Sequence, residues 1–340
     1  MHVVVKVLVF CATIILACHM ATNSSLYRKS VFFFKGLSEF TRNGFQKAAR
    51  NFQTSDLDGD ISGLSYMITG ANSGIGRSTA LSLAGKGATV HIVCRNSTRG
   101  EEAKQDIVSQ TGNDKVQLHL LDISKPRDVI KFADDFVKSD QQLDVLVNNA
   151  GTMVNQRELT EDGLERNFAT NTLGTYLLST ELLPALEKSS DPKVVTVSSG
   201  GMYLMKLDSE NFQFERCSFS GDMVYAQNKR QQVVMTRKWA ESNEKVKFYT
   251  MHPGWADTPA VQQSMPDFHA RLESRLRTPA QGADTIVWLC IAKGMTNGAF
   301  YQDRQAVAQH LTMAWTQSTT EEENLFMTRL EQVASRFRSN

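Results

Sequence analysis

The feature that most restricts the fold is a short apolar strand that runs directly into the glycine-rich segment TGANSGIGRSTALSLA, residues 69–84. Gly70 lets the chain turn tightly, Gly74 lets the backbone approach a pyrophosphate, and Gly76 permits close packing of the following helix. The amino terminus of that helix offers N–H groups to an anion. The pattern predicts a dinucleotide site, against the alternative of a glycine turn without a ligand. The predicted contacts in this turn are Gly70, Ser73, Gly74, Ile75 and Gly76.

The central region alternates apolar strands with polar helices. Strands are expected at YMIT, TVHIVC, VQLHLL, DVLVNN, KVVTVSS and VKFYTM. Continuous apolar strands separated by helices indicate a parallel sheet covered on both faces. We therefore expect an α/β fold, a doubly wound (Rossmann) sheet in a single domain over residues 61–315, with a helical tail at 316–340 and an N-terminal apolar and amphipathic extension.

Residues 1–24 form an apolar leader. The segment VVVKVLVFCATIILAC, residues 3–18, is interrupted by Lys6 and is shorter than the roughly 20 residues that a spanning helix needs. It is compatible with an uncleaved anchor, a cleaved signal sequence or a variable leader that plays no part in the fold. We favour the anchor.

Residues 25–60 are predicted to form a basic amphipathic helical segment. Tyr27, Val31, Phe34 and Leu37 recur at helical spacing, so this apolar stripe can enter lipid while the basic flank meets anionic headgroups. The alternative is a helix packed on the main domain. Positive residues after an apolar segment predict that the following domain faces the cytosol, in an organelle that the sequence does not indicate. The basic residues are Arg28, Lys29, Lys35, Arg42, Lys47 and Arg50.

Charge and cysteine content exclude two classes of partner. A formal net charge of +1 does not suit a polyanion-binding surface, so nucleic acid is not expected. The five cysteines are scattered, with no Cys-x-x-Cys pair and no histidine cluster at metal-ligand spacing, so no metal site is predicted.

The end of the second expected strand, HIVCRN, places Arg95 where the adenosine ribose of a bound dinucleotide would lie. No Asp or Glu is present there to accept from a free 2′-hydroxyl. Guanidinium groups form strong charge-assisted bonds with phosphate, so NADP(H) is favoured and NAD(H) is the alternative.

Tyr225 precedes Lys229 by four positions in MVYAQNKRQQVV, residues 223–234. Positions at this spacing share one face of a helix, so a phenol and an ammonium can point to the same place. The spacing alone is equally typical of a solvated helix face.

Further motifs occur with these two, and together they cover residues 64–260. The sequence resembles the short-chain dehydrogenase/reductases, which implies an NAD(P)-dependent enzyme that acts on alcohol and carbonyl groups. A closer resemblance to one member of the family begins near Ser25, which implies that residues 1–24 are an addition to the usual start. The motifs are TGANSGIG at 69–76, LDIS at 121–124, NNAG at 148–151, VTVSS at 195–199, YAQNK at 225–229 and HPGWADT at 252–258.

The resemblance implies a catalytic role for four residues. Tyr225 would give a proton to the substrate oxygen during reduction and accept one during oxidation. Lys229 would hold the nicotinamide ribose and lower the pKa of the phenol from its ordinary value of about 10. Ser199 would bind the substrate oxygen, and Asn171 would hold a water through which Lys229 reaches solvent.

Three more positions are cofactor contacts by the same resemblance. Asp122 would contact adenine, Asn149 would line the cofactor groove, and Thr258 would bind the nicotinamide carboxamide. The simpler alternatives are a helix cap, a strand-end turn and a loop hydroxyl, respectively.

The stretch between Ser199 and Tyr225 is longer than in the family's simplest members and lies beside the predicted active site. Its apolar residues can form a wall, which favours a small lipophilic carbonyl or alcohol as substrate. A self-packed surface hairpin is the alternative. The residues of this wall are Met202, Leu204, Met205, Phe212 and Phe214.

Two other functions fit parts of the pattern. An extended-type epimerase or dehydratase shares Tyr-x-x-x-Lys, but it tends to space its glycines as GxxGxxG and adds a larger carboxy-terminal domain. A membrane-associated NADP-binding interaction or sensing protein with little turnover is disfavoured by the intact set of catalytic positions. A membrane surface is an expected partner, and a homo-oligomer is compatible with the sequence.

Overall fold

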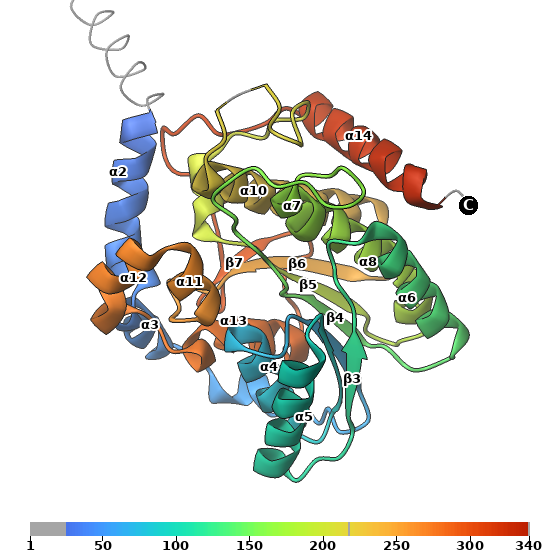
Figure 1. Ribbon diagram of the computed structural model, residues 1–340. Helices are drawn as coiled ribbons and strands as arrows, with labels where there is room; N and C mark the ends of the chain where they lie inside the picture. The colour runs from blue at the N-terminus through green and yellow to red at the C-terminus, as the bar shows by residue number, and fades with distance from the viewer. Residues whose placement is uncertain (1–24, 217, 339–340) are drawn as a thin grey trace, which may run out of the picture.

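The computed structural model describes residues 25–216 and 218–338, so the predicted leader at 1–24 lies outside the described residues (Figure 1). Its centre is an eight-stranded sheet in the order β3-β2-β1-β4-β5-β6-β7-β8, in which only β7 and β8 pair antiparallel. The predicted doubly wound α/β fold is confirmed. The strands are β1 (Ser65–Thr69), β2 (Thr89–Cys94), β3 (Val116–Leu120), β4 (Val145–Asn148), β5 (Lys193–Val197), β6 (Lys247–His252), β7 (Phe300–Gln302) and β8 (Gln305–Val307).

Helices cover both faces of this sheet. Tyr66 and Ile68 of β1 pack with α4, α5 and α13, whereas Met67, between them, packs with α6, α8 and α10, outside which α14 lies. Because both faces are covered, β1 is wholly buried and reads as a continuous apolar run. The helices are α4 (Gly74–Ala84), α5 (Ser97–Thr111), α6 (Pro126–Lys138), α8 (Thr175–Glu181), α10 (Gly221–Ser242), α13 (Pro279–Ile291) and α14 (Thr320–Arg338).

None of the helices in the described part of the chain is both long enough and apolar enough to cross a bilayer. Shorter elements form several of the connections between the main helices and strands. The short elements are α7 (Arg166–Phe168), η3 (Ala169–Gly174), α9 (Leu183–Leu186), η4 (Gly200–Leu204), α11 (Pro259–Ser264), α12 (Pro266–Leu272) and η5 (Glu273–Arg275).

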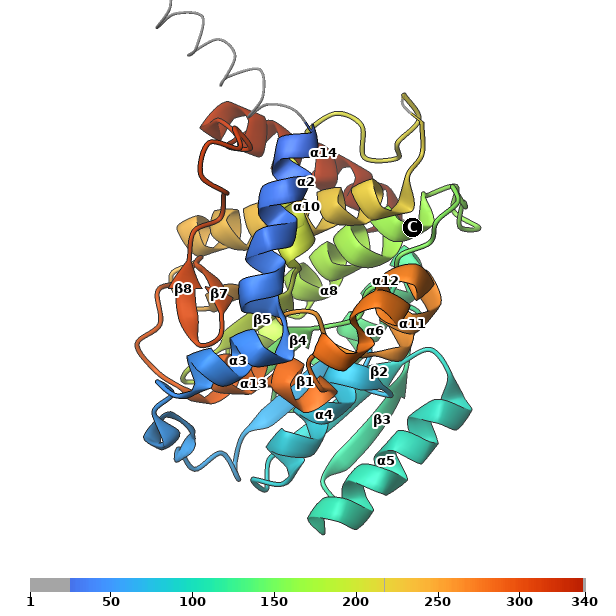
Figure 2. The ribbon, with the colours of Figure 1, turned by 90° about the vertical axis from the view of Figure 1, so that its left-hand side faces the viewer.

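The amino-terminal segment forms α2 (Ser25–Lys35), η1 (Gly36–Phe40), α3 (Arg42–Ala49) and η2 (Thr54–Leu57) and packs on the main domain. Figure 2 looks onto α2, which lies between the β7–β8 edge of the sheet and α12. Phe40 is fully buried, and its ring centroid lies 5.8 Å from that of Phe32 and 5.7 Å from that of Trp255. The segment thus packs on the main domain, which the sequence analysis gave as the alternative to a helix that enters lipid.

The predicted apolar stripe of α2 is therefore divided between the protein and solvent. The Tyr27 hydroxyl donates to the Thr312 carbonyl at 3.2 Å, and Val31 packs against the core around Phe40. Phe34 remains 69% exposed. A single lipid-facing stripe is thus wrong, because the aromatic surface around Phe40 and Trp255 binds one side of the helix.

Candidate active site

The glycine turn lies at the carboxyl end of β1 and leads into α4. Gly70 and Gly74 have positive φ angles of 66° and 54°, a region that favours glycine. A methyl group on Gly76 would lie 2.5 Å from the Gly70 carbonyl oxygen, so a larger residue does not fit between turn and helix. The Ser73 side chain makes no capping bond to the described chain, and Ile75 packs against α13. The first N–H groups of α4 are therefore available to an anion, and the turn fits a pyrophosphate.

Asn149 and Thr258 both lie against this turn. Asn149 Nδ2 donates to the Thr69 carbonyl at 2.8 Å, which fastens the end of β4 to the start of the turn. A methyl group on Gly74 would lie 3.2 Å from Thr258 Cγ2. The Thr258 hydroxyl accepts from the Val261 N–H as the N-cap of α11. Both residues thus shape the predicted groove, and Thr258 also ends a loop.

Asp122 and Arg95 lie just beyond β3 and β2. The Asp122 carboxylate accepts from the Ser124 N–H at 3.0 Å and from the Ser124 hydroxyl at 2.7 Å, so it shapes a turn and not the helix cap. Arg95 is exposed, and residues 25–216 and 218–338 offer its guanidinium no recorded ion pair or hydrogen bond. Arg77, by contrast, is paired with Asp106 of α5. Arg95 is therefore available to a phosphate at the edge of the turn.

Tyr225 and Lys229 share the face of α10 that meets β5. Lys229 Nζ donates to the Val197 carbonyl at 2.8 Å and lies 5.3 Å from the centroid of the Tyr225 ring. The Ser198 hydroxyl donates to the Lys229 carbonyl at 2.9 Å, so the end of β5 holds the helix in place. With Lys229 only 2% exposed, this is not a solvated helix face.

The pKa values of this pair differ from the simple expectation. Burial raises the pKa of Tyr225 to about 12, although a hydrogen bond with Ser199 acts in the opposite direction. Burial lowers the pKa of Lys229 to about 7. The expected lowering of the phenol pKa by the ammonium is therefore wrong for the protein alone, because the loss of water on burial raises the pKa of Tyr225.

Asn171 lies in η3, a single π-turn of the kind often found at functional sites. Its Oδ1 accepts from the Thr152 N–H and its Nδ2 donates to the Thr152 carbonyl, both at 2.8 Å. A methyl group on Gly151 would lie 3.3 Å from Asn171 Oδ1 and 3.5 Å from Lys229 Nζ. Because Gly151 has no side chain, the space between Asn171 Oδ1 and Lys229 Nζ stays open.

Ser199 follows β5 and begins η4. Its Oγ accepts from the Gly201 N–H at 3.1 Å, which leaves the hydroxyl hydrogen for another partner. Its hydrogen bond with Tyr225 joins it to the same group. The structure therefore brings Tyr225, Lys229, Ser199 and Asn171 together at the carboxyl ends of β4 and β5.

His252, the last residue of β6, also contacts the site and was not among the predicted residues. Its Nδ1 accepts from the N–H of Gly200, the residue after Ser199, at 2.9 Å. The signal was present in HPGWADT, where a histidine directly follows the strand residues KFYTM, but we singled out only Thr258 in that motif.

The predicted apolar wall is reduced by the structure. Met202 is buried with Phe40, and Phe212 stacks on Phe168 with ring centroids 5.5 Å apart. Both side chains are thus held in the core. Of the five residues, Met205 and Phe214 line a hollow of about 410 Å³ at the start of α10, and Leu204 is half-buried.

Comparison with known proteins agrees with this geometry. The family described as short chain dehydrogenase matches residues 65–209. Dehydrogenase/reductase SDR family member 12 from Bos taurus is 52% identical over 92% of this chain and 99% of its own length. The chain belongs to the short-chain dehydrogenase/reductase family. The predicted resemblance to this family is confirmed, as is the closer resemblance to one of its members. The chain is an NAD(P)-dependent oxidoreductase of the family that acts on CH–OH and C=O groups.

More distant relatives extend the comparison. Retinol dehydrogenase 12 from Homo sapiens is 34% identical over 72% of this chain and 78% of its own length. Among solved structures, an uncharacterised protein from Mycobacterium Paratuberculosis has a TM-score of 0.66 and 26% identity, over 84% of this chain and 97% of its own. A short chain dehydrogenase from Escherichia coli CFT073, complexed with NADPH, has a TM-score of 0.59 and 24% identity, over 74% and 100%. The latter likeness is one of fold.

Proposed function

We propose that the chain is an NADP(H)-dependent oxidoreductase that interconverts a carbonyl and an alcohol on a lipophilic substrate. The observation that carries this proposal is the convergence of Lys229 and Asn171 beside Gly151, with Tyr225 one helical turn away on α10. A solvated or purely structural pair would not need a glycine to keep this space open.

The protein groups have distinct roles in the proposed reaction. A bound nicotinamide would supply or accept the hydride. On substrate binding, Ser199 would turn its hydroxyl hydrogen from Tyr225 to the substrate oxygen, where negative charge develops. With its pKa raised to about 12, Tyr225 is protonated at neutral pH and suited to give its proton during reduction. Lys229, with a pKa of about 7, exchanges protons readily and would restore that of Tyr225.

The preference for NADP(H) rests on Arg95. Arg95 is exposed and directly follows β2 in the chain. The end of β2 lies beside the glycine turn, because the Val93 carbonyl accepts from the Gly70 N–H at 2.8 Å. Arg77 is already paired with Asp106 and is less available.

A lipophilic substrate is supported by the surroundings and by relatives. Met205, Phe214, Met223 and Val224 give the hollow at the start of α10, the helix that carries Tyr225, an apolar part beside polar residues such as Asp208 and Gln227. The relatives include proteins named retinol dehydrogenase 11 and 12. An aldehyde or alcohol on an apolar chain or ring suits such a wall.

The deciding test is Tyr225→Phe in the full chain. NADPH consumption is measured over retinal, steroid ketone and fatty aldehyde panels, and NADPH binding is measured separately. The variant should lose turnover by roughly 10²- to 10⁴-fold while binding NADPH almost as the unchanged protein does. If it kept more than about a tenth of the activity, Tyr225 would not be the acid.

The proposed enzyme also has a membrane-facing surface, formed by exposed apolar residues of α2 and the 311–315 loop. The loop packs beside the start of α2, where Arg28 Nε donates to the Ala314 carbonyl at 2.8 Å. The apolar segment 3–18 precedes α2 in the sequence, and the basic residues after it favour a cytosolic position for the domain. The exposed residues are Leu26, Phe33, Phe34, Met313 and Trp315.

A further inference from the structure

A buried histidine with no part in the proposed chemistry lies directly under the Ser199 turn. His252 is 2% exposed, and its Nδ1 accepts from the Gly200 N–H at 2.9 Å. Since the backbone N–H can only donate, Nδ1 carries no hydrogen and the imidazole proton is on Nε2. Nε2 finds no hydrogen-bond partner within the described chain. A buried polar atom left in this way requires an explanation.

Gly200 and Phe40 pack tightly against the His252 ring and restrict its orientation. A methyl group on Gly200 would lie 2.9 Å from Phe40 Cε2 and 3.0 Å from His252 Nε2. The rings of Phe40 and His252 meet edge to face, with centroids 4.3 Å apart and an interplanar angle of 81°. Phe40 belongs to the amino-terminal segment, which therefore seals the imidazole from water.

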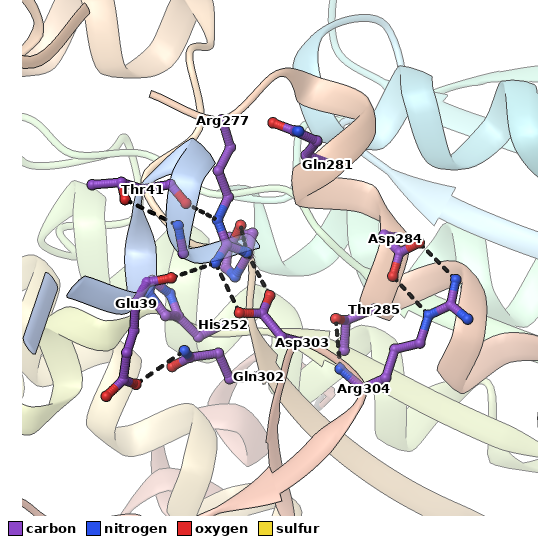
Figure 3. A network of polar contacts seen from close by, with 12 residues as sticks. Glu39, Thr41, His252, Arg277, Gln281, Asp284, Thr285, Gln302, Asp303 and Arg304 are labelled. Atoms are coloured by element: carbon purple, nitrogen blue, oxygen red, sulfur yellow. Dashed lines mark hydrogen bonds and ion pairs between the residues drawn. The ribbon is translucent and has the colours of Figure 1, made fainter. Parts of the chain in front are cut away.

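Burial, together with nearby positive charge, keeps this imidazole neutral. Burial lowers the pKa of His252 well below its ordinary value, and the charges of Arg277 and Lys35 act in the same direction. Figure 3 shows His252 beside Arg277, with Glu39 and Thr41 of the amino-terminal segment around them. A neutral ring can accept from Gly200, whereas a protonated ring cannot.

We propose that His252 is a positioning residue for Ser199, held by Phe40, and that the amino-terminal segment thereby forms part of the active site. By fixing the Gly200 N–H, the imidazole sets the path of the backbone from Ser199 to Gly201. That path determines where the Ser199 hydroxyl hydrogen points, since Oγ is tied to the Gly201 N–H. The inference rests on the proposed role of Ser199 in binding the substrate oxygen.

The test compares two substitutions in the full chain. His252→Leu removes the acceptor, whereas His252→Asn keeps an oxygen near the position of Nδ1. The Leu variant should lose roughly 10- to 100-fold in kcat, the cost of a misplaced group, with the KM for NADPH unchanged. The Asn variant should recover most of that loss. Equal kcat losses in both variants, following their melting temperatures, would mean a role in stability only.

A double-mutant cycle separates positioning from general damage. In a Ser199→Ala background, His252→Leu should change kcat less than twofold if His252 acts through Ser199, whereas additive losses would overturn the inference. His91 supplies the matched control, because it is a buried histidine of β2, three positions away from β5 in the sheet, and is bonded to His119 and Ser65. His91→Leu should lower the melting temperature and leave kcat unchanged.

A second variant keeps the inference testable if His252→Leu does not fold. Phe40→Leu retains an apolar side chain but loses the ring that packs on the imidazole, and it should lower kcat while NADPH binding persists. Unchanged kcat in folded Phe40→Leu would remove the amino-terminal segment from the active site. A different result would contradict the proposed function itself: full turnover by the Ser199→Ala and Tyr225→Phe variants.

Discussion

Two buried cations in this molecule have opposite surroundings. Arg277 is 1% exposed and forms a paired contact with Asp303, at 2.6 and 2.9 Å, and also donates to the backbone carbonyls of Glu39 and Thr41 (Figure 3). Lys229 is 2% exposed and donates to one carbonyl, and the described residues place no carboxylate within ion-pair distance of it.

The difference shows which buried charge is available for chemistry. Arg277 is charge-balanced and its guanidinium hydrogens are used, so it can only hold elements together. Lys229 has no carboxylate partner among the described residues, and burial lowers its pKa to about 7. A group with that pKa gains or loses a proton easily at physiological pH. The surroundings of Arg277 suit a structural role, whereas those of Lys229 suit the proton transfer that we propose for it.

The largest effect is expected at the paired cation. Arg277→Met would leave Asp303 buried without a partner and should destabilise the protein by about 3–5 kcal/mol, measured by urea unfolding. Lys131→Met is the control, since Lys131 pairs with Asp135 on an exposed face and should change stability by less than about 1 kcal/mol. Equal losses in the two variants would break the comparison.

The unpaired cation should behave in the reverse way. Lys229→Met should abolish turnover yet stabilise the fold by about 1–3 kcal/mol, because each unit of pKa shift corresponds to about 1.4 kcal/mol and the lost bond to Val197 offsets part of the gain. With a folded pKa near 7, below the ordinary 10.5, the folded chain releases this proton first. The unfolding free energy of the unchanged protein therefore rises from about pH 7 to 10.5 through this group.

Thermal unfolding of both proteins across this pH range provides the measurement. The advantage of Lys229→Met should be greatest below pH 7 and disappear toward pH 10.5. An advantage that does not change with pH would mean that the methionine side chain simply packs better.

An exposed cation extends the comparison to the cofactor. Arg95→Asp removes the proposed phosphate partner and supplies an acceptor for a 2′-hydroxyl, so the ratio of NADPH to NADH affinity should fall by about 10- to 100-fold. Titration with both reduced cofactors measures this ratio, with Arg99→Asp, three residues into the following helix region, as the control. An unchanged ratio would place the phosphate elsewhere.

The smallest effect is expected on the outer face of α2. Full-length protein should sediment with anionic vesicles at low salt, and Lys29→Ser should weaken that binding about fivefold, since one such charge contributes about 1 kcal/mol. Lys131→Ser on α6 should leave it unchanged. If the full-length protein stays in solution with the vesicles, the exposed residues of α2 have another purpose.

Local patterns in the sequence predicted the parts of the site that neighbouring residues build. The glycine turn needs only a strand and a helix that adjoin it, so its local pattern predicted it. Tyr225 and Lys229 lie on one helix, but their spacing needed the family resemblance beside it before a catalytic role could be predicted. The pKa direction of Tyr225 was missed because burial depends on the packing of distant elements. His252 and Phe40 were missed for the same reason, since their contact joins β6 to a segment near the amino terminus.

The Arg277 contacts also bear on the order in which the chain can fold. The Glu39 carbonyl and its guanidinium partner are separated by 238 positions, and loops of that length close late because the entropy of closure must be overcome first. During synthesis the amino-terminal segment leaves the ribosome early, yet its binding surface around Trp255 and Arg277 is made near the end. Phe32 and Phe40 therefore spend most of translation without their native cover, so this apolar segment is the part of the nascent chain that must be kept from misassociation for longest.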